Sequence, residues 1–262
     1  MITQCFFIYN MQKKKIVYLH SAPEYDILIL HQTRRRTRMT EEINSYPIKN
    51  KYYKHIWYVL IFPAYLIAFF ILEKLIPNDF PTDKMFLSHI PLDDKIPFCE
   101  YFAIPYSLWY PALAAIGIYL IFRDAKGFKK YMIYMGATFF TMIFICAIFP
   151  NYQDMRPDIT GKENIFCFMM KRIYTADTYT NVLPSAHVFG AMAIDFAVID
   201  RKSLRKHKWL LAAAIVLGVL ICVSTVFVKQ HSILDIFAAI PLGFSWWAII
   251  YKVIFREKKQ TE

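Results

Sequence analysis

Long apolar segments alternate with short polar connections along most of the chain. Six of these segments are long enough to cross the hydrocarbon core of a membrane, which takes about 20 residues. The pattern therefore predicts an all-α fold, a polytopic membrane protein built as a bundle of six transmembrane helices. The predicted helices cover residues 55–76, 102–122, 131–150, 183–199, 209–228 and 233–254.

Basic residues mark one side of this predicted bundle. Lys and Arg gather before the first helix and after the second, fourth and sixth, and such clusters identify the cytoplasmic side. Both termini are therefore predicted to be cytoplasmic, and the other connections to face the extracytoplasmic side of the cell membrane. These outward connections are residues 77–101, residues 151–182 and the few residues from Lys229 to Ser232.

The composition indicates lipid rather than nucleic acid as the partner of the chain. Of its 262 residues, 57% are hydrophobic, against about 45–50% in soluble domains. The net charge of +11 follows the predicted membrane topology and excludes a nucleic-acid partner. The five Cys lack the spacing of metal ligands. Cys99 and Cys167 fall in outward connections, and the sequence leaves open whether they pair.

The chain divides into three parts by composition. Residues 55–255 hold the predicted six-helix domain, and residues 256–262 form a cytoplasmic tail. Residues 1–54 are a basic segment without the apolar core or cleavage site of a signal peptide. Its first 38 residues have two interpretations: a disordered basic tail on anionic lipid, or an upstream extension of a reading frame that starts at Met39.

The stretch STVFVKQHSILDI holds the first candidate chemistry. Asp235 follows His231 by four residues at the start of the last predicted helix. Residues four apart stack on one face of a helix, so the carboxylate is expected to hold the imidazole ring. A histidine oriented by a carboxylate is the usual arrangement of a catalytic base or nucleophile.

A second motif, NVLPSAHVFGAMA, opens the fourth predicted helix. Pro184 suits the first turn of a helix because its missing N–H costs nothing there. The free N–H groups of Ser185, Ala186 and His187 are then expected to point out of the helix end, where they attract phosphate. The side chain of His187 is expected to stand beside that anion.

A third motif is Arg156-Pro157, in the outward connection 151–182. The arginine offers a planar fork of donors that matches phosphate oxygens. The predicted topology places Arg156, His187 and His231 on the same face of the membrane. Three motifs suited to phosphate chemistry therefore converge at one place.

Together these motifs resemble the signatures of the type 2 phosphatidic acid phosphatase superfamily, whose members are six-span membrane enzymes. The family's signatures read Lys-x6-Arg-Pro, Pro-Ser-Gly-His and Ser-Arg-x5-His-x3-Asp, and the resemblance covers roughly residues 55–255. The chain departs from them at three positions. Phe149 stands in place of the lysine, Ala186 in place of the glycine, and Thr225 in place of the arginine. Lys229 is a candidate substitute for the lost positive charge.

The resemblance implies a role for each matched residue. His231 is expected to be the nucleophile, Asp235 to orient its ring, and His187 to act as general acid and then general base. No metal and no other cofactor is implied. The expected phosphate ligands are Arg156, Ser185, Ala186 and Lys229. The candidate head-group contacts, just before the second motif, are Tyr174, Asp177 and Asn181.

The function implied by the resemblance is metal-independent hydrolysis of a lipid phosphate at the outer membrane face, through a phosphohistidine intermediate. The expected partners are membrane lipids and a substrate of the phosphatidic acid, phosphatidylglycerol phosphate or undecaprenyl pyrophosphate type. One alternative is a phosphotransferase that moves a phospho-head group to a lipid alcohol, as sphingomyelin and inositol-phosphoceramide synthases do. Another is a six-span binding or transport protein without catalysis. The sequence distinguishes neither the lipid nor the oligomeric state.

Overall fold

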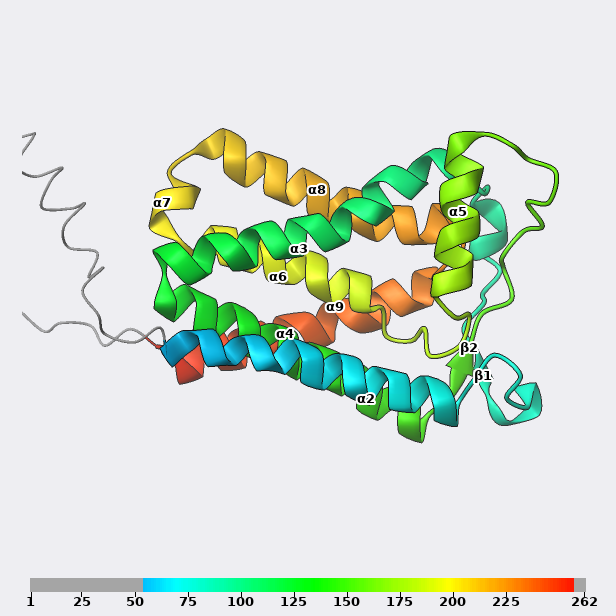
Figure 1. Cartoon of the computed structure of the whole chain (residues 1–262), viewed down its shortest axis with the longest axis horizontal. Helices are drawn as coiled ribbons and strands as arrows, with labels where there is room; N and C mark the ends of the chain where they lie inside the picture. Colours follow the sequence, from blue (N-terminus) through cyan, green and yellow to red (C-terminus); the bar gives the residue numbers. More distant parts are fainter. Residues whose placement is uncertain (1–53, 257–262) are drawn as a thin grey trace, which may run out of the picture. The chain divides into compact units, whose positions relative to one another are not determined.

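The structure is a computed structural model that describes residues 54–256, and these residues fold into a bundle of helices (Figure 1). The predicted basic segment up to residue 53 and the predicted tail from residue 257 lie outside the described residues. The α-helices are α2 (Ile61–Leu75), α3 (Ala103–Arg123), α4 (Ala125–Ile148), α5 (Ile165–Ala176), α6 (Ala186–Asp200), α7 (Lys202–Arg205), α8 (Lys208–Phe227) and α9 (Ile233–Trp247). The remaining elements are the 3-10 helices η1 (Lys54–Leu60), η2 (Thr82–Lys84), η3 (Asp93–Lys95) and η4 (Glu100–Phe102), the π-helix η5 (Ala248–Ile254), and the strands β1 (Phe86–Leu87) and β2 (Asn151–Tyr152).

The all-α prediction is confirmed, whereas the predicted number of spans is not. Within residues 54–256, five helical segments are long and apolar enough to cross a membrane. The helix predicted over 183–199 is α6, which has 15 residues. At 1.5 Å per residue it is about 22 Å long, short of a hydrocarbon core of about 30 Å. The five segments are Lys54–Leu75, Glu100–Arg123, Ala125–Ile148, Lys208–Phe227 and Ile233–Ile254.

Helix α6 is the centre of the bundle. It packs against α3, α4, α8 and α9, and Figure 1 shows it between the pair α3 and α8 and the pair α4 and α9. Except for His187, Asp195 and Asp200, its residues are apolar or small on every side, as expected for a helix buried all round. Phe189 and Ala193, for example, are fully buried. A short but central helix therefore carries the second motif into the interior.

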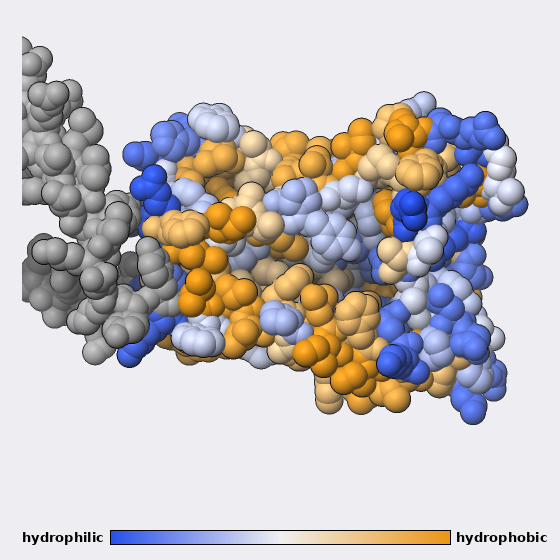
Figure 2. All heavy atoms as spheres, in the orientation of Figure 1, coloured by the Kyte–Doolittle hydropathy of each residue, from blue (hydrophilic) through white to orange (hydrophobic). Residues whose placement is uncertain are grey.

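The outer surface of the bundle is apolar over its middle and hydrophilic at its two ends (Figure 2). Helix α2 illustrates the pattern: of its residues only Tyr65 and Leu72 are buried, while Ile67 and Phe70 are more than half exposed. Side chains of this kind are stable at a surface that faces lipid. The chain is accordingly a multi-pass membrane protein by the character of its helices.

Connections distant in sequence are joined at one end of the bundle. Strands β1 and β2 pair in parallel, with Phe86 opposite Asn151. The fully buried Asn151 also accepts hydrogen bonds from the N–H groups of Val182 and Leu183, both at 2.8 Å. Because these two residues lead directly into α6, Asn151 fixes the segment that carries the second motif. No motif in the sequence indicated this role.

The question of a disulfide between Cys99 and Cys167 is resolved for this structure. Both cysteines are free, as are Cys146 and Cys222. Cys167 and Cys146 are fully buried, where a thiol behaves as a small apolar side chain. Cys5 lies outside the described residues.

Candidate active site

His231 and Asp235 are in direct contact. The Nδ1 atom of His231 lies 3.1 Å from Oδ2 of Asp235, and both side chains are buried. The same Oδ2 accepts the N–H of Ser232 at 3.0 Å, while the Ser232 hydroxyl accepts the N–H of Leu234. This reciprocal capping starts α9 at Ile233. His231 thus precedes the helix, and the predicted contact forms across its first turn rather than along a helical face.

The second motif meets the first through the backbone. Helix α6 begins at Ala186 with Ser185 as its N-cap, so Pro184 lies before the first turn and not within it. The N–H of Ser185 donates to the carbonyl oxygen of Asp235 at 3.2 Å. Of the three N–H groups predicted to be open, those of Ala186 and His187 remain, since the first N–H groups of a helix lack intrahelical partners.

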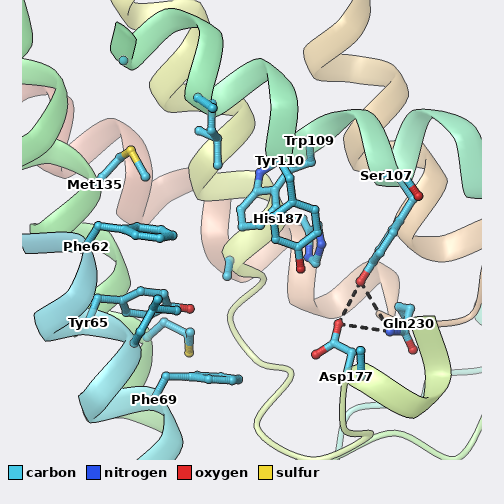
Figure 3. A pocket seen from close by; sticks show the side chains of 18 of the residues that line it. Phe62, Tyr65, Phe69, Ser107, Trp109, Tyr110, Met135, Asp177, His187 and Gln230 are labelled. Atoms are coloured by element: carbon cyan, nitrogen blue, oxygen red, sulfur yellow. Dashed lines mark hydrogen bonds between the residues drawn. The ribbon is translucent and has the colours of Figure 1, made fainter. Parts of the chain in front are cut away.

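The imidazole of His187 lies in an aromatic surround beside His231. Its ring centroid is 4.4 Å from those of Tyr106 and Trp109 and 5.5 Å from that of His231. Neither ring nitrogen of His187 has a hydrogen-bond partner, although both are buried. Figure 3 labels Trp109 and Tyr110 next to His187. The His187 ring is therefore held by packing against Tyr106 and Trp109, and both of its nitrogens are available to bind a ligand.

Tyr106 and Trp109 lie outside the three motifs of the sequence. Their spacing of three places them on one face of α3, which was the available signal. Only packing reveals that this face meets His187 of α6.

A cavity of about 690 Å³ ends at the two histidines. Its walls come from α2, α3 and α4, and Phe62, Tyr65, Phe69 and Met135 make up much of the apolar part (Figure 3). The face drawn in Figure 2 is hollowed between α2 and α3. The volume lies within the range of about 300–1,000 Å³ that is typical of ligand sites.

Asp93 is a second buried carboxylate at the site, and sequence analysis did not single it out. It is fully buried, and its Oδ1 accepts the N–H of Ile233 at 2.9 Å. Its Oδ2 accepts the Ser232 hydroxyl at 2.6 Å and the N–H of Ile90 at 2.9 Å. Asp93 therefore anchors the start of α9, and with it His231, to the connection 77–101.

Lys229 is bound to the same anchor. Its Nζ donates to the carbonyl oxygen of Asp93 at 2.8 Å, and its backbone is left-handed with φ 55°. Burial lowers the pKa of Lys229, and Asp93 and Asp94 partly oppose this shift. Lys229 does not line the cavity, so its role as a phosphate ligand stays a prediction.

Arg156 is held by backbone carbonyl groups. Its Nη1 donates to Tyr174 O at 3.2 Å, and its Nη2 donates to Asp177 O at 3.0 Å and to Thr178 O at 2.5 Å. The guanidinium lies 4.8 Å from the ring centroid of Tyr174. Burial lowers its pKa, and Asp177 opposes that shift. Arg156 lies at the same end of the bundle as the histidines but outside the cavity wall, so direct phosphate binding by it also stays a prediction.

Two of the three candidate head-group residues line the cavity, namely Asp177 and Asn181. Tyr174 does not, because its hydroxyl donates to Val228 O at 2.7 Å. Burial raises the pKa of Tyr174. Gln230, which lies outside the three motifs, joins Asp177 in the cavity wall.

Thr225 stands at the position of the family arginine. It is buried and donates its hydroxyl to Cys222 O.

Comparison with known proteins places this site in a family. The family model described as the PAP2 superfamily matches residues 130–259. This range includes Arg156, His187, His231 and Asp235. No curated protein and no solved structure matches the chain.

Proposed function

The chain belongs to the PAP2 superfamily, and from its site we propose that it is an integral membrane phosphatase that hydrolyses a phosphomonoester or pyrophosphate of a lipid. One observation carries the proposal. His187 and His231 face each other at the end of an apolar cavity, and Asp235 holds one nitrogen of His231. An oriented imidazole, a second imidazole and an adjoining apolar site are what phosphoryl transfer from a lipid requires.

The first chemical step uses Nε2 of His231, because Asp235 occupies Nδ1. Nε2 attacks phosphorus, the bond to the lipid oxygen breaks, and His187 in its protonated form donates its proton to that oxygen. Asp235 accepts the Nδ1–H and stabilises the positive charge that develops on the ring. The lipid alcohol leaves and a phosphohistidine remains.

The second step returns the enzyme to its starting form. His187, now neutral, takes a proton from water as the water oxygen attacks phosphorus, and the bond to Nε2 of His231 breaks. Inorganic phosphate is the product, and His187 is again protonated. The N–H groups of Ala186 and His187 at the start of α6 are suited to stabilise the phosphoryl oxygens in both steps. A direct contact from Arg156 or Lys229 requires that side chain to leave its carbonyl partners.

The shape of the cavity supports a lipid substrate. Its lining follows α3 from Tyr106 to Ile121, which is about 22 Å at 1.5 Å per residue. That length is about three quarters of a hydrocarbon core of about 30 Å. A soluble phosphate ester has no apolar part to cover this apolar wall, whereas an acyl or prenyl chain is long and apolar enough to fill the cavity.

We place the site on the extracytoplasmic side of the cell membrane, with α6 as a sixth, short crossing and both termini in the cytoplasm. The support is the distribution of charge. Helix α7, with Lys202 and Arg205, lies at the end of the bundle opposite α5 and the β-strands (Figure 1). Labelling of a single cysteine introduced at exposed Lys202 or exposed Asp83, with a reagent that does not cross the membrane, tests this placement in intact cells.

A head-group phosphotransferase of the same fold is the second candidate. It is favoured by the polar wall near His187, where Asp177, Asn181 and Gln230 can contact an alcohol. The reaction differs only in the acceptor, since a lipid alcohol replaces water. Purified protein with a phosphate-labelled phospholipid distinguishes the two: release of inorganic phosphate supports the phosphatase, and a new labelled lipid supports the transferase. No turnover of any lipid phosphate contradicts both.

A further inference from the structure

The polar end of the cavity is a connected cluster of three side chains, Tyr106, Asp177 and Gln230. The Tyr106 hydroxyl donates to Oδ2 of Asp177 at 2.9 Å, and Nε2 of Gln230 donates to the same oxygen at 3.1 Å. Nε2 of Gln230 also lies 3.4 Å from the Tyr106 hydroxyl. Figure 3 shows this cluster beside His187, with the second carboxylate oxygen of Asp177 directed away from both donors. These bonds use one oxygen of Asp177 and leave Oδ1.

The amide orientation of Gln230 follows from this network. A carboxylate only accepts hydrogen bonds, so the amide nitrogen must face Asp177 and the oxygen must face away from it. That oxygen, Oε1, is buried and has no partner among the described residues, and Gln230 is 2% exposed. A buried polar atom without a partner is rare in a folded protein and calls for an explanation.

Asn181 repeats the same arrangement in the cavity wall. Its Nδ2 donates to Oε1 of Glu73 at 3.1 Å and to Ile76 O at 3.2 Å. Both partners are acceptors, so the amide oxygen Oδ1 is again the free atom. It is buried without a partner, and Asn181 is 6% exposed. Asp177, Gln230 and Asn181 all line the cavity that ends at His187 and His231. Each has one acceptor oxygen without a hydrogen-bond partner among the described residues: Asp177 Oδ1, Gln230 Oε1 and Asn181 Oδ1.

The charges around these acceptors are balanced. The carboxylates of Asp177 and Glu73 are accompanied by the guanidinium of Arg156, which is bonded to Asp177 O, and by Arg172 in the cavity wall. An ammonium group gains little where the formal charges cancel. A neutral group with O–H donors satisfies the three acceptors without adding charge.

We propose that Asp177, Gln230 and Asn181 form a subsite for a hydroxyl-bearing head group next to the phosphate that His231 attacks. The ligand class is a lipid phosphate whose leaving alcohol carries a free hydroxyl, such as a glycerol head group. The proposal rests on the proposed function, because the phosphate must lie at His187 and His231. It selects among lipid phosphates, since phosphatidic acid and a prenyl pyrophosphate offer no such hydroxyl.

The experiment compares two substrates with identical acyl chains. One is phosphatidylglycerol phosphate, and the other is its analogue with 1,3-propanediol in place of glycerol, which lacks the hydroxyl. The wild-type protein in detergent micelles is expected to hydrolyse the hydroxylated lipid with a kcat/KM about tenfold higher, the value of one hydrogen bond to a charged or otherwise unpartnered acceptor. The Gln230→Leu and Asp177→Asn variants are expected to bring the ratio toward one.

Ser107→Ala is the matched control, because Ser107 lines the same cavity outside the cluster, and it is expected to keep the wild-type ratio. Thermal unfolding identifies a variant that fails to fold, and the more conservative Asp177→Asn then decides. Phosphate release at equal rates from both substrates by the wild type overturns the subsite while the phosphatase stands. A full preference retained in both variants overturns the assignment to these residues. Absence of phosphate release from both lipids overturns the subsite if the protein still hydrolyses phosphatidic acid or undecaprenyl pyrophosphate, and contradicts the proposed function if it hydrolyses neither of these.

Discussion

Asp93 and Ser232 are joined by a fully buried hydrogen bond of 2.6 Å between the carboxylate Oδ2 and the hydroxyl, across 139 residues of sequence. Ser232 is the N-cap of α9 and the direct neighbour of His231. Asp93 also accepts the N–H of Ile233. The carboxylate of the connection 77–101 thus holds the backbone that carries the proposed nucleophile.

Replacing Asp93 by Ala is expected to lower both stability and activity. The change leaves the part-buried N–H groups of Ile90 and Ile233 and the buried Ser232 hydroxyl without their acceptor. Each buried group left without a partner costs about 1–3 kcal/mol. Thermal unfolding in detergent and phosphate release measure the two effects. Asp83→Ala is the control, because Asp83 is exposed on the same connection. Equal behaviour of the two variants contradicts the anchoring role.

His231→Ala is expected to abolish phosphate release, since it removes the proposed nucleophile. His187→Ala is expected to retain a trace, because general acid–base catalysis contributes about 10²–10⁴-fold. Rapid quenching with labelled substrate adds a direct measurement: the His187 variant should accumulate labelled protein that is stable in alkali and labile in acid. Label retained by the His231 variant would show that another residue is the nucleophile.

Gly190→Ala is expected to disturb His187 through Trp109. A Cβ at Gly190 would meet the Trp109 indole well inside van der Waals contact, and that indole packs on the His187 ring. Overpacking costs about 1–3 kcal/mol, more than the gain of about 1 kcal/mol in helix propensity. The expected result is a lower Tm together with a lower kcat.

Gly117→Ala serves as the comparison for stability. A Cβ there meets only Tyr131, at an ordinary distance of 3.6 Å, so the helix-propensity gain is expected to leave Tm unchanged or higher. If Gly190→Ala behaved like Gly117→Ala, the packing of Trp109 on α6 would not control the site.

His89 gives the connections 77–101 and 151–182 a pH-dependent contact. Its ring nitrogens lie 2.8 Å from Asp94 and 2.8 Å from Asp154. Partial burial lowers its pKa, but hydrogen bonds to the two carboxylates outweigh burial and raise the pKa above its usual value. The protonated form is thus favoured in the folded state.

The sign of the pH effect follows. The contribution of His89 to stability is fully present below its unfolded pKa of about 6.5 and is lost as the pH rises through the higher folded pKa. Because the pair is partly exposed, the effect should stay below about 1 kcal/mol. Tm measured from pH 5 to 9 for wild type and His89→Gln is expected to converge at high pH. A gap that widens toward high pH would contradict this assignment.

Arg156→Lys distinguishes a structural role from phosphate binding. A lysine keeps the charge but loses the planar fork that reaches Tyr174 O, Asp177 O and Thr178 O. Loss of these contacts is expected to lower Tm and to raise KM, since the same segment carries Asp177. A raised KM with an unchanged Tm would instead identify Arg156 as a phosphate ligand.

Parts of the site could be predicted from the sequence because they involve residues close together in the chain. The contact between His231 and Asp235 depends on four residues of chain, and the open N–H groups of Ala186 and His187 depend on where α6 begins. The exact positions were less secure. Pro184 lies before α6 rather than in its first turn, and the N–H of Ser185 donates to Asp235 O instead of remaining open. Contacts with other segments shift the start of a helix by one or two residues.

The sequence by itself determined the helical membrane class and the residues of the three motifs. The lengths of the apolar segments and the spacing of the motif residues are properties of the sequence, so both can be determined without the tertiary structure. Only the tertiary structure decided that Asp93 anchors Ser232, that Tyr106 and Trp109 enclose His187, and that Arg156 and Lys229 bind carbonyl oxygens. These contacts join segments far apart in sequence. Their geometry depends on how the helices pack around α6, and periodicity does not encode that packing.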